Sequence, residues 1–223
     1  MESSVYDLNQ RVVNCKKCPR LIGDISEVAT VKIKRFRHET YWGKPVPGFG
    51  DFNPKVLLLG LAPAAHGANR TGRMFTGDSS GDWLTKALYE TGFANQRTSE
   101  NLKDGLKLNE IYLSASARCA PPKNKPTKFE IENCRSFLME ELELFRNVEI
   151  ILALGAIAFK NVLATLNLKG LPFGHNKLFQ LDEKRALLSS YHPSRQNTQT
   201  GRLLWSNWLA IFQRVRKYID ASK

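Results

Sequence analysis

Three polar side chains and one aromatic ring stand where they could do chemistry together. Asp78 and Phe75 lie in the glycine- and hydroxyl-rich loop 61–81, Asn124 lies in a proline-studded loop, and His192 directly precedes a proline. Each loop follows an apolar segment, and the carboxyl ends of parallel strands meet at one edge of a sheet. A carboxylate, an amide and an imidazole can donate, accept and orient hydrogen bonds. Their convergence predicts an active site at that edge.

Taken singly, these residues also have simpler interpretations. Asp78 could cap the helix that follows it, Phe75 could belong to the core, and Asn124 could cap a turn. His192 is harder to explain in that way. The prediction of a site therefore depends on the three loops acting together.

The elements that would position these loops alternate between strand and helix patterns. Short apolar runs bounded by turn residues predict four buried strands, at 56–60, 111–117, 148–154 and 185–190. Helical patterns follow at 6–13, 82–91, 127–145, 155–166 and 203–218. The third of these helices opens with Thr127 and Glu130, a capping-box pair. This order predicts a three-layer α/β/α fold with a central, mostly parallel, four-stranded sheet, in a single domain over residues 1–223.

Composition narrows the functional class. The 223 residues are 42% hydrophobic and carry a net charge of +12. A strongly basic chain favours a polyanionic partner such as nucleic acid, although a thermophilic or ribosome-associated protein could show the same charge. No apolar run is long enough to span a bilayer, and Met1–Ser4 does not begin a signal peptide. We expect a monomeric cytoplasmic protein that associates with the nucleoid and not with membranes.

A basic and aromatic segment at 32–44 has two interpretations. Lysines and arginines alternate there with Phe36, Tyr41 and Trp42. Such a run is usually a solvated face, and contact with DNA is the alternative.

The four cysteines suggest a metal site. Cys15 and Cys18 are two residues apart, whereas fourteen residues separate Cys119 from Cys134. In a reducing compartment, metal binding is favoured over disulfides. Only one of the two pairs is tight, so spacing alone leaves zinc and a 4Fe-4S cluster equally open, with four unrelated buried thiols as the third alternative.

The ordered motifs resemble those of the family 5 (type B) uracil-DNA glycosylases over nearly the whole chain. The segments that carry the resemblance are 60–67, 69–73, 75–78, 118–126 and 192–197. The resemblance implies a 4Fe-4S cluster on Cys15, Cys18, Cys119 and Cys134, and base excision repair of DNA that contains uracil.

The resemblance also implies roles for the site residues. His192 would donate a hydrogen bond to the uracil carbonyl as negative charge develops on the departing base. Phe75 would stack on the flipped base, and Asn124 would read its edge. Backbone amides around Leu61 and Ala62 would add further contacts.

Leu61 and Ala62 stand where related enzymes of the wider superfamily place a carboxylate or an amide. Neither can activate water, so Asp78 is the candidate to orient it, unless ordinary solvent captures a dissociated oxocarbenium ion. The apolar pair also predicts a tolerant pocket that accepts other deaminated bases such as hypoxanthine.

The loop 194–202 would press into the duplex beside the flipped base, or be a plain surface loop. The predicted DNA-binding residues are Arg70, Arg73, Arg195, Gln196, Asn197 and Arg202. No lysine is placed as a Schiff-base nucleophile, which predicts a monofunctional enzyme. Two other classes stay open, an iron-sulfur redox protein and a non-catalytic nucleic-acid binder. A sliding-clamp partner is left unspecified.

Overall fold

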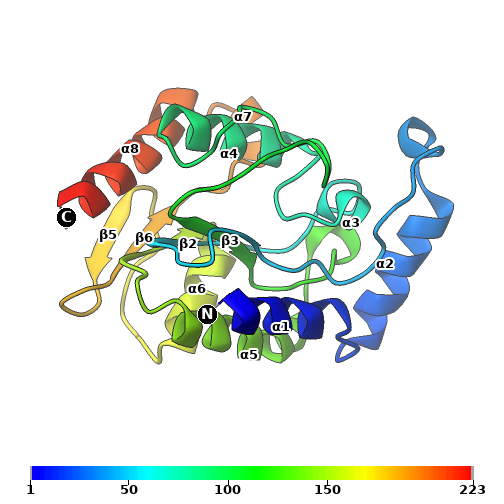
Figure 1. Ribbon diagram of the computed structural model, residues 1–223, viewed down its shortest axis with the longest axis horizontal. Coiled ribbons are helices and arrows are strands. Elements are labelled where there is room, and N and C mark those ends of the chain that lie inside the picture. Colours follow the sequence, from blue (N-terminus) through cyan, green and yellow to red (C-terminus); the bar gives the residue numbers. More distant parts are fainter. Residues whose placement is uncertain (1, 222–223) are drawn as a thin grey trace.

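The fold is built on one six-stranded sheet, in a computed structural model that describes residues 2–221 (Figure 1). The strand order is β1-β3-β2-β4-β6-β5. The strands are β1 (Phe49–Gly50), β2 (Val56–Gly60), β3 (Ile111–Ala115), β4 (Ile150–Leu154), β5 (Lys177–Gln180) and β6 (Ala186–Ser190). The four inner strands run parallel, and β1 and β5 are antiparallel edges.

The inner strands confirm the predicted α/β class and its four parallel strands. Every residue of β2, β3, β4 and β6 is buried, as expected for strands that helices cover on both faces. The two edge strands were not predicted, so the sheet has six strands and not four. The strand β1 has only two residues and so shows no periodicity. In β5 the two end residues are exposed and the two middle residues are half-buried, so buried and exposed positions do not alternate.

Eight α-helices lie among the described residues. They are α1 (Glu2–Val13), α2 (Pro19–Val31), α3 (Ala68–Thr71), α4 (Ser79–Glu90), α5 (Lys128–Leu144), α6 (Ala156–Thr165), α7 (Arg195–Gln199) and α8 (Trp205–Ala221). Short 3₁₀ helices occupy Lys34–Phe36 and Pro122–Asn124. The capping box of Thr127 and Glu130 is present at the start of α5. Helices α2, α3 and α7 were not predicted. None of the described helices is long and apolar enough to cross a membrane.

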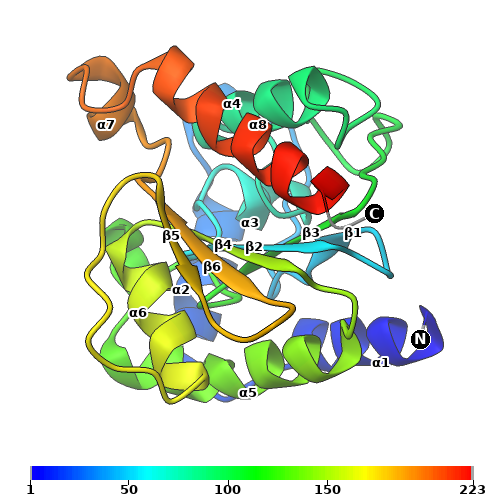
Figure 2. The same ribbon diagram turned by 90° about the vertical axis from the view of Figure 1, so that its left-hand side faces the viewer.

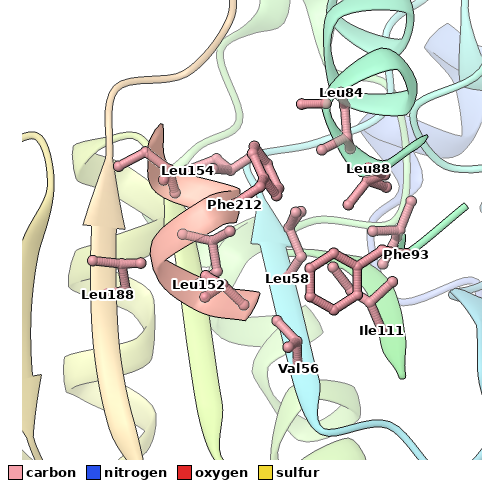
Figure 3. Close-up of a cluster of buried hydrophobic side chains, with 14 of the residues drawn as sticks. Val56, Leu58, Leu84, Leu88, Phe93, Ile111, Leu152, Leu154, Leu188 and Phe212 are labelled. Atoms are coloured by element: carbon pink, nitrogen blue, oxygen red, sulfur yellow. The ribbon is translucent and has the colours of Figure 1, made fainter. Parts of the chain in front are cut away.

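The helices form two layers around the sheet. Helices α4 and α8 cover one face, and α1, α5 and α6 lie on the other (Figures 1 and 2). Alternate residues of each strand serve the two cores: Leu58 packs with Leu84 and Phe212, whereas Leu57 packs with residues of α5 and α6. Figure 3 shows the first cluster, in which β2, β4 and β6 meet α4 and α8. This packing fixes the strand ends from which the functional loops leave.

Candidate active site

A cavity of about 810 Å³ opens beyond the carboxyl ends of the parallel strands. It brings together the six residues that the sequence predicted for catalysis and substrate binding: Leu61, Ala62, Phe75, Asp78, Asn124 and His192. They come from the loops after β2, β3 and β6. Parallel strands in register deliver those loops to one edge, as the sequence analysis expected.

Asp78 lines this cavity and also caps a helix. Its Oδ1 accepts hydrogen bonds from the amides of Ser80 and Gly81, both at 2.9 Å, at the amino end of α4. A Cβ atom on Gly67 would lie 2.1 Å from the other oxygen, Oδ2. Burial raises the pKa of Asp78, and the two amides oppose that rise. The cap therefore holds one oxygen, and only glycine at 67 leaves room for the second.

Two glycines place the Phe75 ring. A Cβ on Gly60, the last residue of β2, would lie 2.7 Å from Phe75 Cζ, and one on Gly81 would lie 2.3 Å from Phe75 O. Phe75 itself has φ of 51°, an uncommon conformation for a bulky residue. Its ring lies nearly parallel to the His192 ring, at 28° with centroids 6.3 Å apart. The backbone turn at Phe75 thus directs its ring into the cavity, where it lies beside the His192 ring.

His192 follows β6 and is held through its backbone. Asn197 Nδ2 donates to His192 O at 2.8 Å, and Ser80 Oγ donates to Pro193 O at 3.2 Å. Removal from water lowers the pKa of His192 to about 4. The imidazole is therefore neutral at pH 7, with one ring nitrogen able to donate a hydrogen bond.

Asn124 reaches the cavity from the rim. It is exposed, and it ends the 3₁₀ helix Pro122–Asn124 in a left-handed conformation with φ of 57°, next to Lys123 with φ of 54°. Its backbone amide donates to Pro121 O at 3.0 Å. This turn leaves the side-chain amide at the mouth of the cavity.

Arg73 was predicted to bind DNA, and its burial argues against such a contact. Only 3% of its surface is exposed. Its guanidinium makes a bidentate pair with Asp104, with one oxygen at 2.9 Å and the other at 2.5 Å, and also donates to Ser99 and Thr76. All its donor groups point into the protein, and Arg73 therefore holds the loop 99–104 in place.

Arg70 and Asn197 are also engaged inside the protein. Arg70 donates to His66 O at 2.8 Å and Gly77 O at 3.1 Å and pairs with Glu39, with 10% of its side chain exposed. Asn197 is half-buried, and its amide nitrogen holds the backbone of His192. Both residues shape the loops around the cavity.

Three of the predicted DNA contacts are exposed beside the cavity. Arg195 and Gln196 line its edge, and Arg195 Nε lies 3.3 Å from Ser79 Oγ. Arg202 is exposed and lies over the Tyr191 ring, 4.6 Å from its centroid. These three side chains are accessible to a duplex.

The four cysteines come from the N-terminal segment and from the middle of the chain, and they interact. Cys15 follows α1, Cys18 caps α2, Cys119 follows β3 and Cys134 lies in α5. All four are free thiols. Burial raises the pKa of Cys119, and the other three thiols raise it further by repulsion. Among residues 2–221, no group of His, Cys, Asp or Glu side chains is tight enough to hold a single metal ion.

The sequence analysis missed the loop after β4. Gly155, Ala156 and Ile157 also line the cavity, and a Cβ on Gly155 would contact His192 Cβ at 3.6 Å. The signal was the glycine that directly follows the strand, with φ of 92°. It marks a turn that brings the first turn of α6 to the site.

The chain is similar to known proteins over most of its length. A family model described as the uracil DNA glycosylase superfamily matches residues 47–216, so the chain and its fold belong to that superfamily. Type-5 uracil-DNA glycosylases of Thermus thermophilus and Mycobacterium tuberculosis are 46% and 45% identical to the chain. The alignments cover 93% and 96% of this chain, and 95% and 81% of the respective relatives. A type-4 enzyme of Archaeoglobus fulgidus is 24% identical over 86% of the chain and 82% of its own length.

The chain therefore belongs to the type-5 uracil-DNA glycosylases. Enzymes of this family are hydrolases of N-glycosyl bonds and act in base excision repair.

Replacing Asn197 with alanine is expected to reduce the single-turnover rate of uracil release about 10- to 100-fold. The change lets His192 shift, and a small displacement of a catalytic group is costly. The change removes the 2.8 Å hydrogen bond to the His192 carbonyl. DNA affinity should stay close to that of the unmodified protein. Single-turnover kinetics and a DNA-binding titration measure the two quantities. Weaker binding with an unchanged rate would instead make Asn197 a DNA contact.

Proposed function

We propose that the protein is a monofunctional glycosylase that flips uracil, hypoxanthine and other deaminated bases out of DNA and hydrolyses their N-glycosidic bonds. The observation that carries this proposal is the convergence of Phe75, Asp78, Asn124 and His192 on one cavity of about 810 Å³. That cavity is large enough for a single base, and extrusion of the base is what makes its glycosidic bond accessible.

Breaking the glycosidic bond leaves negative charge on the base and positive charge on the sugar. A neutral His192 can donate a hydrogen bond to the base carbonyl where that charge develops, and its low pKa means that the ring is uncharged when it does so. The Asn124 amide can donate and accept at the edge of the base, and Phe75 offers a face for stacking.

Asp78 is suited to the sugar side of the reaction. Its Oδ1 is fixed by two amides, which leaves Oδ2 to orient the attacking water. A carboxylate in the lining of the cavity also favours a neighbouring positive charge, such as the oxocarbenium-like sugar. Its position as a helix cap keeps the carboxylate in one orientation before the substrate arrives.

Leu61 and Ala62 support a broad choice of bases. Both line the cavity, and neither carries a side chain that demands a hydrogen-bond partner. An apolar wall discriminates weakly between related ligands, because no buried polar group is left unpaired by the wrong one.

A direct test compares two duplexes that differ in one base, uracil or hypoxanthine, each followed by alkaline cleavage of abasic sites. We expect both to be cleaved, with no cleavage before the alkali because the enzyme is monofunctional. Release of uracil alone would contradict the tolerant pocket and keep the glycosylase. Release of neither base would favour a redox or purely binding function, and a gel-shift titration with the same duplexes would separate those two.

The duplex would lie across the exposed side chains beside the cavity. Arg195, Gln196 and Arg202 are accessible there, and the net charge of +12 supplies the long-range attraction to phosphates. In the basic segment 32–37, Lys34, Arg35 and Arg37 are also exposed and could extend this surface.

We also propose that Cys15 and Cys18 of an N-terminal segment hold a 4Fe-4S cluster together with Cys119 and Cys134, within a single domain. Four thiols that repel one another once ionised fit a metal centre that needs thiolates, and Cys18 and Cys119 already share one buried cluster. The cluster would tie α1 and α2 to α5 and to the loop that carries Asn124. Its contribution there is structural.

A further inference from the structure

Arg118 is the most deeply buried cation among the described residues 2–221. It is 1% exposed, and its Nη2 donates to Glu141 Oε1 at 2.6 Å. Glu141 is 0% exposed, and its second oxygen accepts from Ser114 Oγ at 2.7 Å. Both oxygens of the Glu141 carboxylate therefore have a hydrogen-bond partner. Within residues 2–221, however, Arg118 Nε and Nη1 are buried and have no hydrogen-bond partner.

Two unpaired guanidinium nitrogens in a protein interior call for an acceptor. Buried polar groups are nearly always hydrogen-bonded, and buried charged groups carry the largest penalty when they are not. Arg73 provides the comparison, since it is similarly buried and donates from all three of its nitrogens. Arg118 differs in the neighbourhood it occupies.

That neighbourhood is the cysteine group. Arg118 directly precedes Cys119, and its backbone hydrogen-bonds to the thiol of Cys134. Its charge also acts on Cys134. Cys134 and Glu141 are two helical turns apart on α5 and share one face. Arg118 therefore runs along that face, with its backbone at the cysteine and its guanidinium at the carboxylate.

In the described part of the chain, no second buried cation lies beside the cysteine group. Arg20 approaches Cys18 but is half-exposed and bidentate to Glu130, and Lys17 is exposed. Four thiolates in a buried site need compensating charge or hydrogen bonds. Asn133 Nδ2 donates to Cys18 Sγ at 3.4 Å, and the unpaired donors of Arg118 are buried groups that can supply further hydrogen bonds.

We propose that Arg118 is a positioning residue for the cofactor, whose Nε and Nη1 donate hydrogen bonds to sulfur atoms of the cluster bound by Cys119 and Cys134. Glu141 then orients the guanidinium from the opposite side. This inference rests on the 4Fe-4S cluster proposed above. It predicts that the guanidinium retains iron and favours the reduced state of the cluster, because hydrogen bonds and positive charge near sulfur stabilise added negative charge.

The decisive variant is Arg118→Lys, which keeps the charge and removes Nε and Nη1. The matched control is Arg73→Lys, which alters an equally buried pair that lies away from the cysteines. Iron and sulfide content, iron release to a chelator, the iron–thiolate Raman bands and the reduction potential are measured for each purified protein. We expect Arg118→Lys to release iron about 10- to 100-fold faster, with shifted bands and a lower potential. Arg73→Lys should match the unmodified protein.

A second variant guards against misfolding of the first. Glu141→Gln leaves the guanidinium in place and removes its neutralising carboxylate, so its reduction potential should rise, opposite in sign to the Arg118→Lys change. Iron release and potential unchanged in both variants would overturn the proposal and leave the pair purely structural, with water on Nε and Nη1. If the unmodified protein, purified anaerobically, contained no iron, the cluster itself would be refuted. Uracil release would still test the glycosylase separately.

Discussion

Replacing Asp78 with asparagine is expected to slow uracil release about 100- to 10,000-fold, the range for losing a positioned acid or base. Asparagine caps a helix about as well as aspartate, so the hydrogen bonds from the Ser80 and Gly81 amides should persist and the free energy of unfolding should change by only a few tenths of a kcal/mol. What is lost is the charge and basicity of the carboxylate. Single-turnover kinetics and urea unfolding measure the two quantities.

Two further variants separate the roles of Asp78. Asp78→Ala removes the cap as well and should cost about 1 kcal/mol of stability in addition to the activity. Gly67→Ala leaves the carboxylate but forces Oδ2 to move, because the new Cβ would lie 2.1 Å from it. If Asp78→Asn releases uracil at the rate of the unmodified protein, solvent captures the oxocarbenium ion without help from this residue.

The pH dependence gives an independent check on Asp78. Burial raises its pKa, and a residue that orients water must be ionised. Activity of the unmodified protein should therefore decline as the pH falls through this raised pKa. Asp78→Asn should lack that decline in its residual activity.

The fold was predictable where local pattern and burial agree. The run 56–60 is apolar at every position, and the structure buries all of it as a central parallel strand. By contrast, β1 is two residues long and exists only because Phe49 and Gly50 pair with Leu113 and Tyr112 of β3. Such an edge depends on a partner some sixty residues away, and a sequence window cannot contain it. Helix α2 was missed although Pro19 occupies its first turn, a usable signal.

The site was predictable in its membership but not in its supports. Loop positions after apolar runs gave Asp78, Asn124 and His192, since the carboxyl ends of parallel strands converge. Arg73 and Arg195 look alike in sequence, each being an arginine in a polar loop. Arg73 is buried because Asp104, thirty-one residues along the chain, pairs with it. Arg195 is exposed at the surface. Burial of a charge depends on tertiary partners that no local motif specifies.

Replacing His192 with alanine should reduce uracil release about 100- to 1,000-fold, the usual cost of losing one donor to a developing anion. Single-turnover kinetics measure the rate, and circular dichroism should show an intact fold, because the described hydrogen bonds of His192 are made by its backbone and not its ring. His38→Ala, at an exposed residue outside the cavity, is the matched control. An unchanged rate in His192→Ala would remove the residue from the reaction.

The low pKa of His192 decides how that donor works. Its ring has a pKa of about 4 in the folded protein and about 6.5 when exposed to water, so the native ring stays neutral between those values. The rate should therefore show no inflection near pH 6.5, and such an inflection would instead indicate an imidazolium that transfers its proton to the base. The unfolded chain takes up the proton first, so the associated stability is fully present above pH 6.5 and is lost as the pH falls towards 4. In His192→Ala this part of the acid sensitivity should disappear together with the activity, which links both effects to one desolvated ring.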